Sequence, residues 1–250
     1  MHADHVTGLP GMLMLSSQVD RSEPLYIYGP AKLKDYIEQT RKLLDMYINY
    51  EIIVKTATPG VLVETDEYTI EAFPLYHTKP CVGYTLKEKL RPGIFHPQKA
   101  IELGIPKGPA WSTLQKGENY VCEDGSVIIP NMILGDKREG RTFSYVTDTL
   151  YHPSIASHVN GADLLLCEGM FDESLIESAI DKKHMTSKQA AQIALEGNVK
   201  RMGLFHYSPR YSNKELKLLL KEAQETFPSS FLARDRDHIT LELKILADVG

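Results

Sequence analysis

Three side chains that commonly bind metal ions lie within the first five residues of the chain. They are His2, Asp4 and His5, which form the pattern HxDH ahead of the segment VTGLPGML. Neutral imidazole and carboxylate groups suit zinc, manganese or iron, and a tight turn can direct alternate side chains at two neighbouring ions. Such a short pattern also arises by chance at a polar chain end, so further ligands are needed elsewhere.

Three more potential ligands follow apolar, extended runs. His77 ends TIEAFPLYH, Asp148 ends TFSYVTD and His206 ends MGLFH. Proteins of the α/β class place their chemistry in the crevice beyond the carboxyl ends of the strands, so these side chains are expected to meet there. With the N-terminal pattern they supply four histidines and two aspartates. A dinuclear site with an open position for water requires about that many ligands.

An acid and a histidine form a second candidate pair. Glu168 follows ADLLLC, and His184 precedes Thr186 at the start of an amphipathic helix. In a purely structural role they are a strand-end acid and a neighbour of a helix cap. In a functional role, the carboxylate orients the imidazole, which donates a proton to a leaving oxygen.

Short β-rich runs alternate with amphipathic helices around these residues. Extended runs are expected at 25–28, 51–57, 61–66, 68–77, 82–89, 142–149, 162–169, 201–207 and 239–246. Helices are expected over 33–44, 173–181, 186–195 and 213–226. The four runs between 51 and 89 predict an antiparallel or mixed sheet, and the later alternation predicts an α/β layered domain. Because extended runs follow one another in the first half and alternate with helices in the second, two packed sheets with outer helices are expected.

Residues 90–118 interrupt this alternation. The stretch contains eight glycines and prolines and the single tryptophan, Trp111. This density of residues that interrupt helices and strands predicts a protruding insertion. From Lys79 to Lys116 there are seven basic and two acidic side chains, a local net charge of +5, in a chain whose formal net charge is -5. This segment could meet a polyanion although the whole chain is acidic.

The composition is that of an ordinary globular protein, with 250 residues, 42% hydrophobic and 24% charged. No apolar run approaches the roughly 20 residues of a membrane-spanning helix, and no secretory signal is recognisable, so a cytoplasmic location is expected. Cys81, Cys122 and Cys167 are too far apart in the sequence for a CxxC site and are expected to be reduced and structural.

Eight segments then occur in a characteristic order: HADHVTGLPGML, LYHTKPCVGYTLKEK, GIPKGPAW, LQKGE, SYVTDT, CEGMF, KKHMTSKQAA and LFHYSPRY. In this order and at these separations they resemble ribonuclease Z, the tRNA 3′-endonuclease family of the metallo-β-lactamase superfamily. The resemblance runs over essentially the whole chain. It implies one domain over residues 1–250 with an αβ/βα four-layer sandwich, incomplete at its first strands, and two zinc ions between the sheets.

The resemblance also implies a role for each candidate residue. His2 and His77 would bind the first zinc ion, Asp4, His5 and His206 the second, and Asp148 would bridge both. Asp4 would in addition accept a proton and help to generate the attacking hydroxide. Glu168 and His184 would assist the leaving group.

By the same resemblance, Lys107, Gly108 and Pro109 match the tip of a flexible arm, inserted over 88–127, that grips tRNA. The implied reaction removes the 3′ trailer of precursor tRNA and leaves a 3′-hydroxyl on the tRNA and a 5′-phosphate on the trailer. The implied partners are precursor tRNA and a second copy of the chain in a homodimer, with neither DNA nor membrane.

One feature departs from the family pattern HxHxDH. Met1 occupies the position between its first two histidines, so one ligand of the first zinc ion is expected to be missing. Either the sequence starts at an internal methionine of a longer protein or it is a short form with altered metal binding. Two other functions therefore stay open: a dinuclear-metal hydrolase of small phosphodiesters or sulfate esters, and an inactive tRNA-binding remnant.

Overall fold

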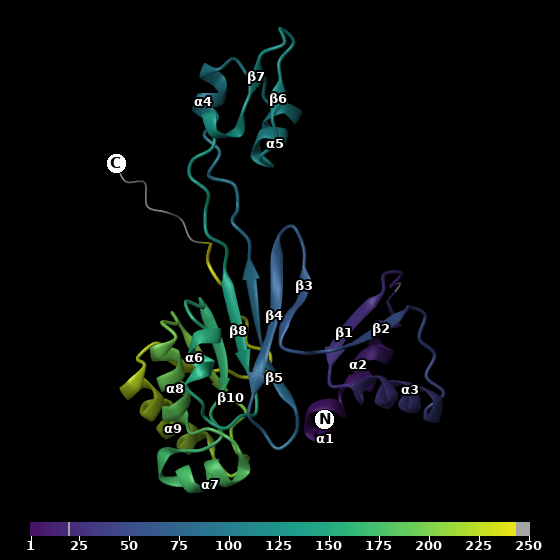
Figure 1. Cartoon of the computed structure of the whole chain (residues 1–250), viewed down its shortest axis with the longest axis vertical. Helices are drawn as coiled ribbons and strands as arrows, with labels where there is room; N and C mark the ends of the chain where they lie inside the picture. Colours follow the sequence, from purple (N-terminus) through teal and green to yellow (C-terminus); the bar gives the residue numbers. More distant parts are fainter. Residues whose placement is uncertain (20, 244–250) are drawn as a thin grey trace. The chain divides into compact units, whose positions relative to one another are not determined.

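A computed structural model describes residues 1–19 and 21–243 of the chain (Figure 1). The chain divides into two compact units. The first contains Met1–Glu64, Ile70–Leu86 and Phe143–Asp237, and the second contains Thr65–Thr69, Lys87–Thr142 and the described residues from 238 to 243. Within the described ranges, no helix is long and apolar enough to cross a bilayer.

A seven-stranded sheet organises the first unit, with the strand order β11-β10-β9-β8-β5-β4-β3. Its strands are β3 (Gly60–Glu64), β4 (Tyr68–Leu75), β5 (Cys81–Glu88), β8 (Thr142–Val146), β9 (Leu164–Glu168), β10 (Met202–Phe205) and β11 (Ser230–Leu232). The pairs β8–β9, β9–β10 and β10–β11 are parallel. Val146 lies opposite Cys167, and Phe205 lies opposite Glu168. The carboxyl ends of β8, β9 and β10 therefore lie side by side at the same end of the strands.

Two packed sheets with outer helices were expected because the two halves differ in strand pattern, but the strands do not divide between sheets at the middle of the chain. Strands β3 to β5 join β8 in a single sheet, in which the hydroxyls of Thr85 on β5 and Ser144 on β8 are hydrogen-bonded at 2.9 Å. Both of these side chains are buried, so each satisfies the other's polar group inside the sheet.

Three helices cover one face of the parallel strands: α6 (Ser154–His158), α8 (Ser187–Glu196) and α9 (Asn213–Thr226) (Figure 1). Helices α8 and α9 both begin with a capping box, formed by Thr186 with Gln189 and by Ser212 with Glu215. The buried face of α8 is made largely of alanine, which lets the helix approach the sheet closely. Both helices were predicted from the sequence, with ends that differ by at most one residue.

The first residues of the chain form a smaller layer. It consists of α1 (Ala3–Val6), α2 (Leu9–Ser16), β1 (Leu25–Gly29), α3 (Leu33–Leu43) and β2 (Ile52–Thr56). The run 51–57 was expected to pair with the extended runs that follow it. Instead β2 pairs in parallel with β1, because α3 crosses between the two strands and their apolar side chains pack with Leu13, Leu33 and Ile37.

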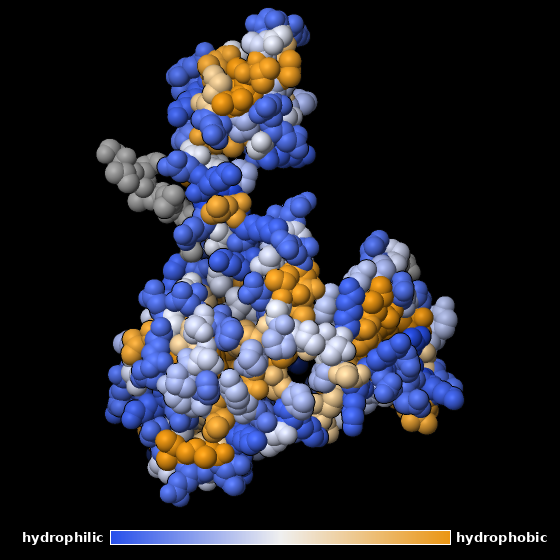
Figure 2. All heavy atoms as spheres, viewed as in Figure 1, coloured by the Kyte–Doolittle hydropathy of each residue, from blue (hydrophilic) through white to orange (hydrophobic). Residues whose placement is uncertain are grey.

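The second unit has a hydrophobic core of its own. Its elements are α4 (Pro97–Glu102), α5 (Pro109–Gln115), β6 (Tyr120–Val121), β7 (Val127–Ile128) and η1 (Pro130–Met132). Leu114 and Ile133 are fully buried in it, and the indole N–H of Trp111 donates to the carbonyl of Ile105 at 3.2 Å. Pro97 and Pro109 stand in the first turns of helices, where a missing N–H costs nothing. Figure 2 shows apolar surface gathered over these elements.

The strand expected at 239–246 is not found: residues 239–243 are not in a strand, and residues 244–246 lie outside the described residues. The last strand of the sheet is β11, which pairs with β10 at Met202 to Leu204. The hydroxyl of Tyr207 also donates to the carbonyl of Ala233, just after β11. The sequence of β11 has no periodicity that predicts a strand. Its extended conformation therefore depends on pairing with β10 at the edge of the sheet.

An ion pair joins the two chain segments at which the second unit begins and ends. Glu88 accepts hydrogen bonds from the guanidinium and the backbone N–H of Arg141, and the backbone N–H of Glu88 donates to the carbonyl of Arg141 at 2.9 Å. The hydrogen bonds from Arg141 hold the pKa of Glu88 at about 2, although partial burial opposes this shift.

Glu88→Gln is expected to lower the stability of the second unit by about 1–2 kcal/mol at pH 7, the range of a partly exposed hydrogen bond to a charged group. Because the folded-state pKa lies below the unfolded one, this contribution is full above about pH 4.5 and is lost as the pH falls toward 2. Urea unfolding monitored by Trp111 fluorescence at pH 7 and pH 3 measures it. The exposed Glu118→Gln serves as the control, and an equal loss in both variants would contradict the assignment.

Candidate metal centre and active site

The N-terminal segment brings three candidate ligands to the end of β4. His2 is extended and precedes α1, whereas Asp4 and His5 lie within this helical turn. Two contacts hold the segment in place: the Lys79 ammonium donates to the Met1 carbonyl at 3.1 Å, and the Thr78 hydroxyl lies 3.2 Å from Nε2 of His2. The chain start is therefore fixed beside the loop that carries His77.

The parallel strands deliver the other candidates. Asp148 follows β8, Glu168 is the last residue of β9, and His206 directly follows β10. Because these three strands are neighbours, their side chains gather at one edge of the sheet, as the sequence predicted. His206 has a φ of 57°, a left-handed backbone that a non-glycine residue rarely adopts and that is typical of functional sites.

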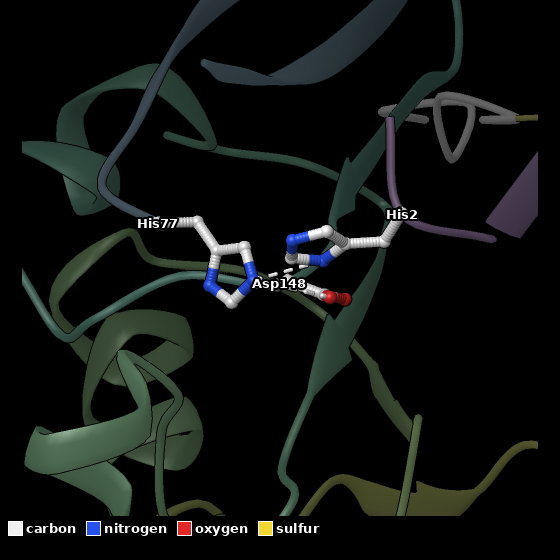
Figure 3. A group of neighbouring side chains, drawn as sticks. All are labelled: His2, His77 and Asp148. Atoms are coloured by element: carbon white, nitrogen blue, oxygen red, sulfur yellow. Dashed lines mark hydrogen bonds and ion pairs between the residues drawn. The ribbon is translucent and has the colours of Figure 1, made fainter. Parts of the chain in front are cut away.

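The carboxylate of Asp148 lies at the centre of the site. Its side chain is 6% exposed, and its oxygens lie 3.1 Å from Nε2 of His5, 3.4 Å from Nε2 of His206 and 3.7 Å from Nε2 of His77. Burial favours the neutral acid, but the imidazoles of His206 and His5 outweigh it and lower the pKa of Asp148. Figure 3 shows the rings of His2 and His77 converging on this carboxylate.

All six predicted ligands fall into compact groups whose ligand atoms lie within 4.8 Å of one another. The groups are His2, His77 and Asp148; Asp4, His5 and His206; and Asp148, His184 and His206. The first two correspond to the two expected ligand sets. The third adds His184, which sequence reasoning placed in proton transfer.

The donor atoms suit a divalent metal. Nδ1 of His77 donates to the carbonyl of Lys183 at 2.8 Å, so Nε2 carries the lone pair, and it faces Nδ1 of His2 at 3.3 Å. Such a second hydrogen bond is what orients a histidine ligand in metal sites. Nδ1 of His206 is buried without a hydrogen-bond partner among the described residues. Burial lowers the pKa of both His2 and His206, which favours the neutral imidazole that binds metal.

Beside the ligands, Glu168 and His184 form a buried pair. Glu168 is fully buried and accepts from Nδ1 of His184 at 3.0 Å and from the backbone N–H of Thr149 at 2.6 Å. Burial would lower the pKa of His184, but the hydrogen bond to Glu168 and its negative charge raise it. With Nδ1 engaged in this way, Nε2 of His184 is the nitrogen that remains for a ligand or a substrate oxygen.

Several supporting residues were not anticipated from the sequence. The Thr147 hydroxyl donates to Asp148 at 3.0 Å, and the backbone of Lys183 supplies the carbonyl that orients His77. Lys182 and Arg210 both place their charges against the ring of Phe171, at 5.8 and 5.1 Å from its centroid. The sequence could have indicated Thr147, because in the run VTDT a threonine directly precedes the candidate ligand Asp148. The Lys183 carbonyl has no sequence signal, because any residue provides one.

The predicted RNA-binding residues Lys107, Gly108 and Pro109 belong to the second unit and are not part of this cluster. Gly108 precedes α5 with a φ of 142°, a conformation that residues with a side chain rarely adopt. Lys107 is exposed just before this turn.

Known proteins resemble the chain over nearly its whole length, although no protein-family model matches it. The ribonuclease Z of Treponema denticola is 57% identical over 242 residues, which cover 96% of this chain and 79% of the relative. The ribonuclease Z of Treponema pallidum strain Nichols is 52% identical, over 94% of this chain and 76% of the relative. The crystal structure of human tRNase Z, short form, aligns with a TM-score of 0.66 at 22% identity, over 97% of this chain and 77% of that one.

The sheet, its covering helices and the histidine–aspartate cluster at the strand ends define a metallo-β-lactamase fold with a candidate site for divalent metal. Within this fold, the identity to curated relatives assigns the family plainly. The chain belongs to the ribonuclease Z family, whose members are metal-dependent endonucleases that hydrolyse phosphodiester bonds.

Asp148→Ala is expected to reduce the metal bound per chain at least twofold, because three imidazoles lose their shared carboxylate. Elemental analysis after dialysis against zinc or manganese measures it. His152→Gln is a matched control, since this histidine stacks on Tyr76 beside the site but belongs to none of the three ligand groups. Unchanged metal content in Asp148→Ala would sink the assignment of the cluster.

Proposed function

We propose that the protein is a zinc-dependent endoribonuclease that removes the 3′ trailer of precursor tRNA. The observation that carries the proposal is the position of Asp148, between the imidazoles of His5, His77 and His206, in a chain of the ribonuclease Z family. Phosphodiester hydrolysis needs a site that activates water and protonates a leaving oxygen, and this cluster lies beside a buried acid–imidazole pair.

On the side of the attacking water, His2 and His77 would hold one metal ion, Asp4, His5 and His206 a second, and Asp148 both. When bound, the metal supplies Lewis-acid chemistry, which acidifies water and neutralises charge on the phosphate oxygens. Asp4 accepts the proton that the water loses. Its side chain is 73% exposed, so it can pass this proton on to solvent.

On the side of the leaving group, His184 acts as the general acid. Nε2 donates a proton to the departing 3′-oxygen as the P–O3′ bond breaks, which leaves a 3′-hydroxyl on the tRNA and a 5′-phosphate on the trailer. Glu168 is a positioning residue: it holds Nδ1 of His184 and is itself held by the backbone N–H of Thr149. A fixed carboxylate therefore determines both the tautomer and the orientation of the acid.

The second unit is assigned to RNA binding in the same proposal. Lys107, Gly108 and Pro109 lead into α5 in the basic segment between residues 79 and 116, and Lys107 and Pro109 are exposed. Contacts from lysine and arginine to backbone phosphates position an RNA without reading its sequence, so the folded shape of tRNA is what the protein recognises. A cytoplasmic location and a homodimer belong to the proposal too, and family membership is their support.

The proposal is tested by incubating the protein with a precursor tRNA that carries a 3′ trailer, with mature tRNA as the control. We expect one cut, a 3′-hydroxyl on the tRNA and a 5′-phosphate on the trailer, loss of activity with a chelator and its return with zinc. Hydrolysis of bis(p-nitrophenyl) phosphate without any cut in the precursor would favour the small-phosphodiester function. Binding of the precursor without cleavage at any metal concentration would favour a non-catalytic remnant.

Glu168→Gln is expected to lower kcat for the precursor by about 10²-fold, because His184 loses the carboxylate that orients it and favours its protonated form. KM and the bound metal should stay within about twofold of the parent values, since the reaction and not the binding is affected. Glu225→Gln provides the control, because Glu225 is exposed on α9, where it pairs with Lys221. An equal loss of kcat in both variants, or a parallel loss of metal, would show a merely structural role for Glu168.

A further inference from the structure

Two arginines face each other across the antiparallel segments at which the second unit begins and ends. The backbone N–H of Arg91 donates to the carbonyl of Arg138 at 2.9 Å, and that of Arg138 donates to the carbonyl of Arg91 at 3.0 Å. Residues in such a pair project their side chains on the same face, and like charges directly opposite are destabilising. A local arrangement that costs stability without a structural gain is a signature of a functional site.

The guanidinium groups of these two arginines bind backbone carbonyls within the described part of the chain. Nε of Arg138 donates to the carbonyl of Pro92 at 3.1 Å, and one terminal nitrogen of Arg91 reaches the carbonyl of Glu139 at 3.5 Å. Nε of Arg91 is buried and has no hydrogen-bond partner among the described residues. The charge of Arg91 helps to lower the pKa of Glu88, but the Glu88 carboxylate is hydrogen-bonded to Arg141.

Both arginines line a surface cleft of about 400 Å³ within the second unit, together with Pro92, Gly93, Ile94, Phe95 and Gln115. The wall of the cleft requires glycine at position 93. A Cβ there would lie 1.9 Å from the carbonyl oxygen of Gly135, because the two backbones approach closely. The amide of Gln115, at the end of α5, adds a neutral donor to the two guanidinium groups.

We propose that this cleft binds a backbone phosphate of the RNA substrate, with Arg91 and Arg138 as paired guanidinium donors and Gln115 as a further donor. Planar guanidinium groups match phosphate oxygens with two parallel hydrogen bonds, and a phosphate between them removes the repulsion of the like charges. The inference rests on the proposed function for the identity of the ligand. It assigns a contact separate from the turn at Lys107 to Pro109 and from the metal-ligand cluster.

The test compares binding of precursor tRNA to the parent protein and to Arg91→Gln and Arg138→Gln, in a chelator so that no cleavage occurs. Each variant should bind about tenfold more weakly, and the slope of log K against log salt should become shallower by about one. Lys137→Gln is the matched control, because it removes the same charge next to Arg138 from an exposed residue that does not line the cleft. It should change binding less than twofold.

Two further measurements make the outcome decisive. Urea unfolding of each variant identifies any loss of fold, and Arg138→Lys, which keeps the charge but not the paired donors, should bind at least threefold more weakly than the parent. Polyglutamate serves as a competitor with carboxylates in place of phosphates and should compete poorly with the tRNA.

Unchanged tRNA binding in folded Arg91→Gln and Arg138→Gln would overturn the proposal, as would an equal loss in Lys137→Gln. Strong competition by polyglutamate would reassign the cleft to a carboxylate-bearing protein partner. A parent protein that neither binds nor cleaves precursor tRNA would refute the proposed function. If the parent binds and cleaves the precursor and the arginine variants bind it equally well, only the proposal for the cleft is refuted.

Discussion

A carboxylate that is 6% exposed needs neighbouring positive charge or hydrogen bonds, because an uncompensated ion inside a protein costs several kcal/mol. Asp148 meets this requirement with three imidazoles that arrive on separate segments: His5 on α1, His77 after β4 and His206 after β10. These segments lie far apart in the sequence. The need to compensate one buried charge therefore brings the chain start, the end of β4 and the end of β10 to the same point.

A second buried carboxylate extends this arrangement. Glu168 ends the strand next to β8, and it accepts hydrogen bonds from the backbone after Asp148 and from His184 ahead of α8. The parallel register of β8 and β9 thus sets the separation of the two acids. The capping box at Thr186 fixes where α8 begins, and with it the position of His184. Ordinary fold-forming interactions therefore determine the geometry of the candidate catalytic pair.

The two compact units have different chemistry. The first holds the imidazoles and carboxylates that suit a metal ion, and the second contains most of a basic segment with its own small core. Binding a polyanion needs exposed positive charge, whereas a metal cluster needs neutral imidazole and negative carboxylate, so each unit carries one of two opposite electrostatic requirements. The second unit also places Arg91 directly opposite Arg138, and like charges in such a pair repel each other.

Long-range pairing is the part of the fold that sequence reasoning missed. The helices of the second half and the strands that end at Asp148, Glu168 and His206 follow from local periodicity, because each element buries one face. The partner of β2 and the edge strand β11 do not follow from it. Which strands pair depends on crossovers and on sheet edges that exist only after the chain has collapsed. The run 239–246 has a strand pattern, but the sheet uses 230–232 at its edge instead.

By itself, the sequence determined which side chains could act and in which elements they lie, because ligand type and strand-end position are local properties. It indicated all six candidate metal ligands and the Glu168–His184 pair. Only the tertiary structure decided that Asp148 is buried at the centre, that the Lys183 carbonyl orients His77 and that Arg91 faces Arg138. Burial, a backbone hydrogen bond and cross-strand register all join residues that are distant in the sequence, and no local pattern encodes such contacts.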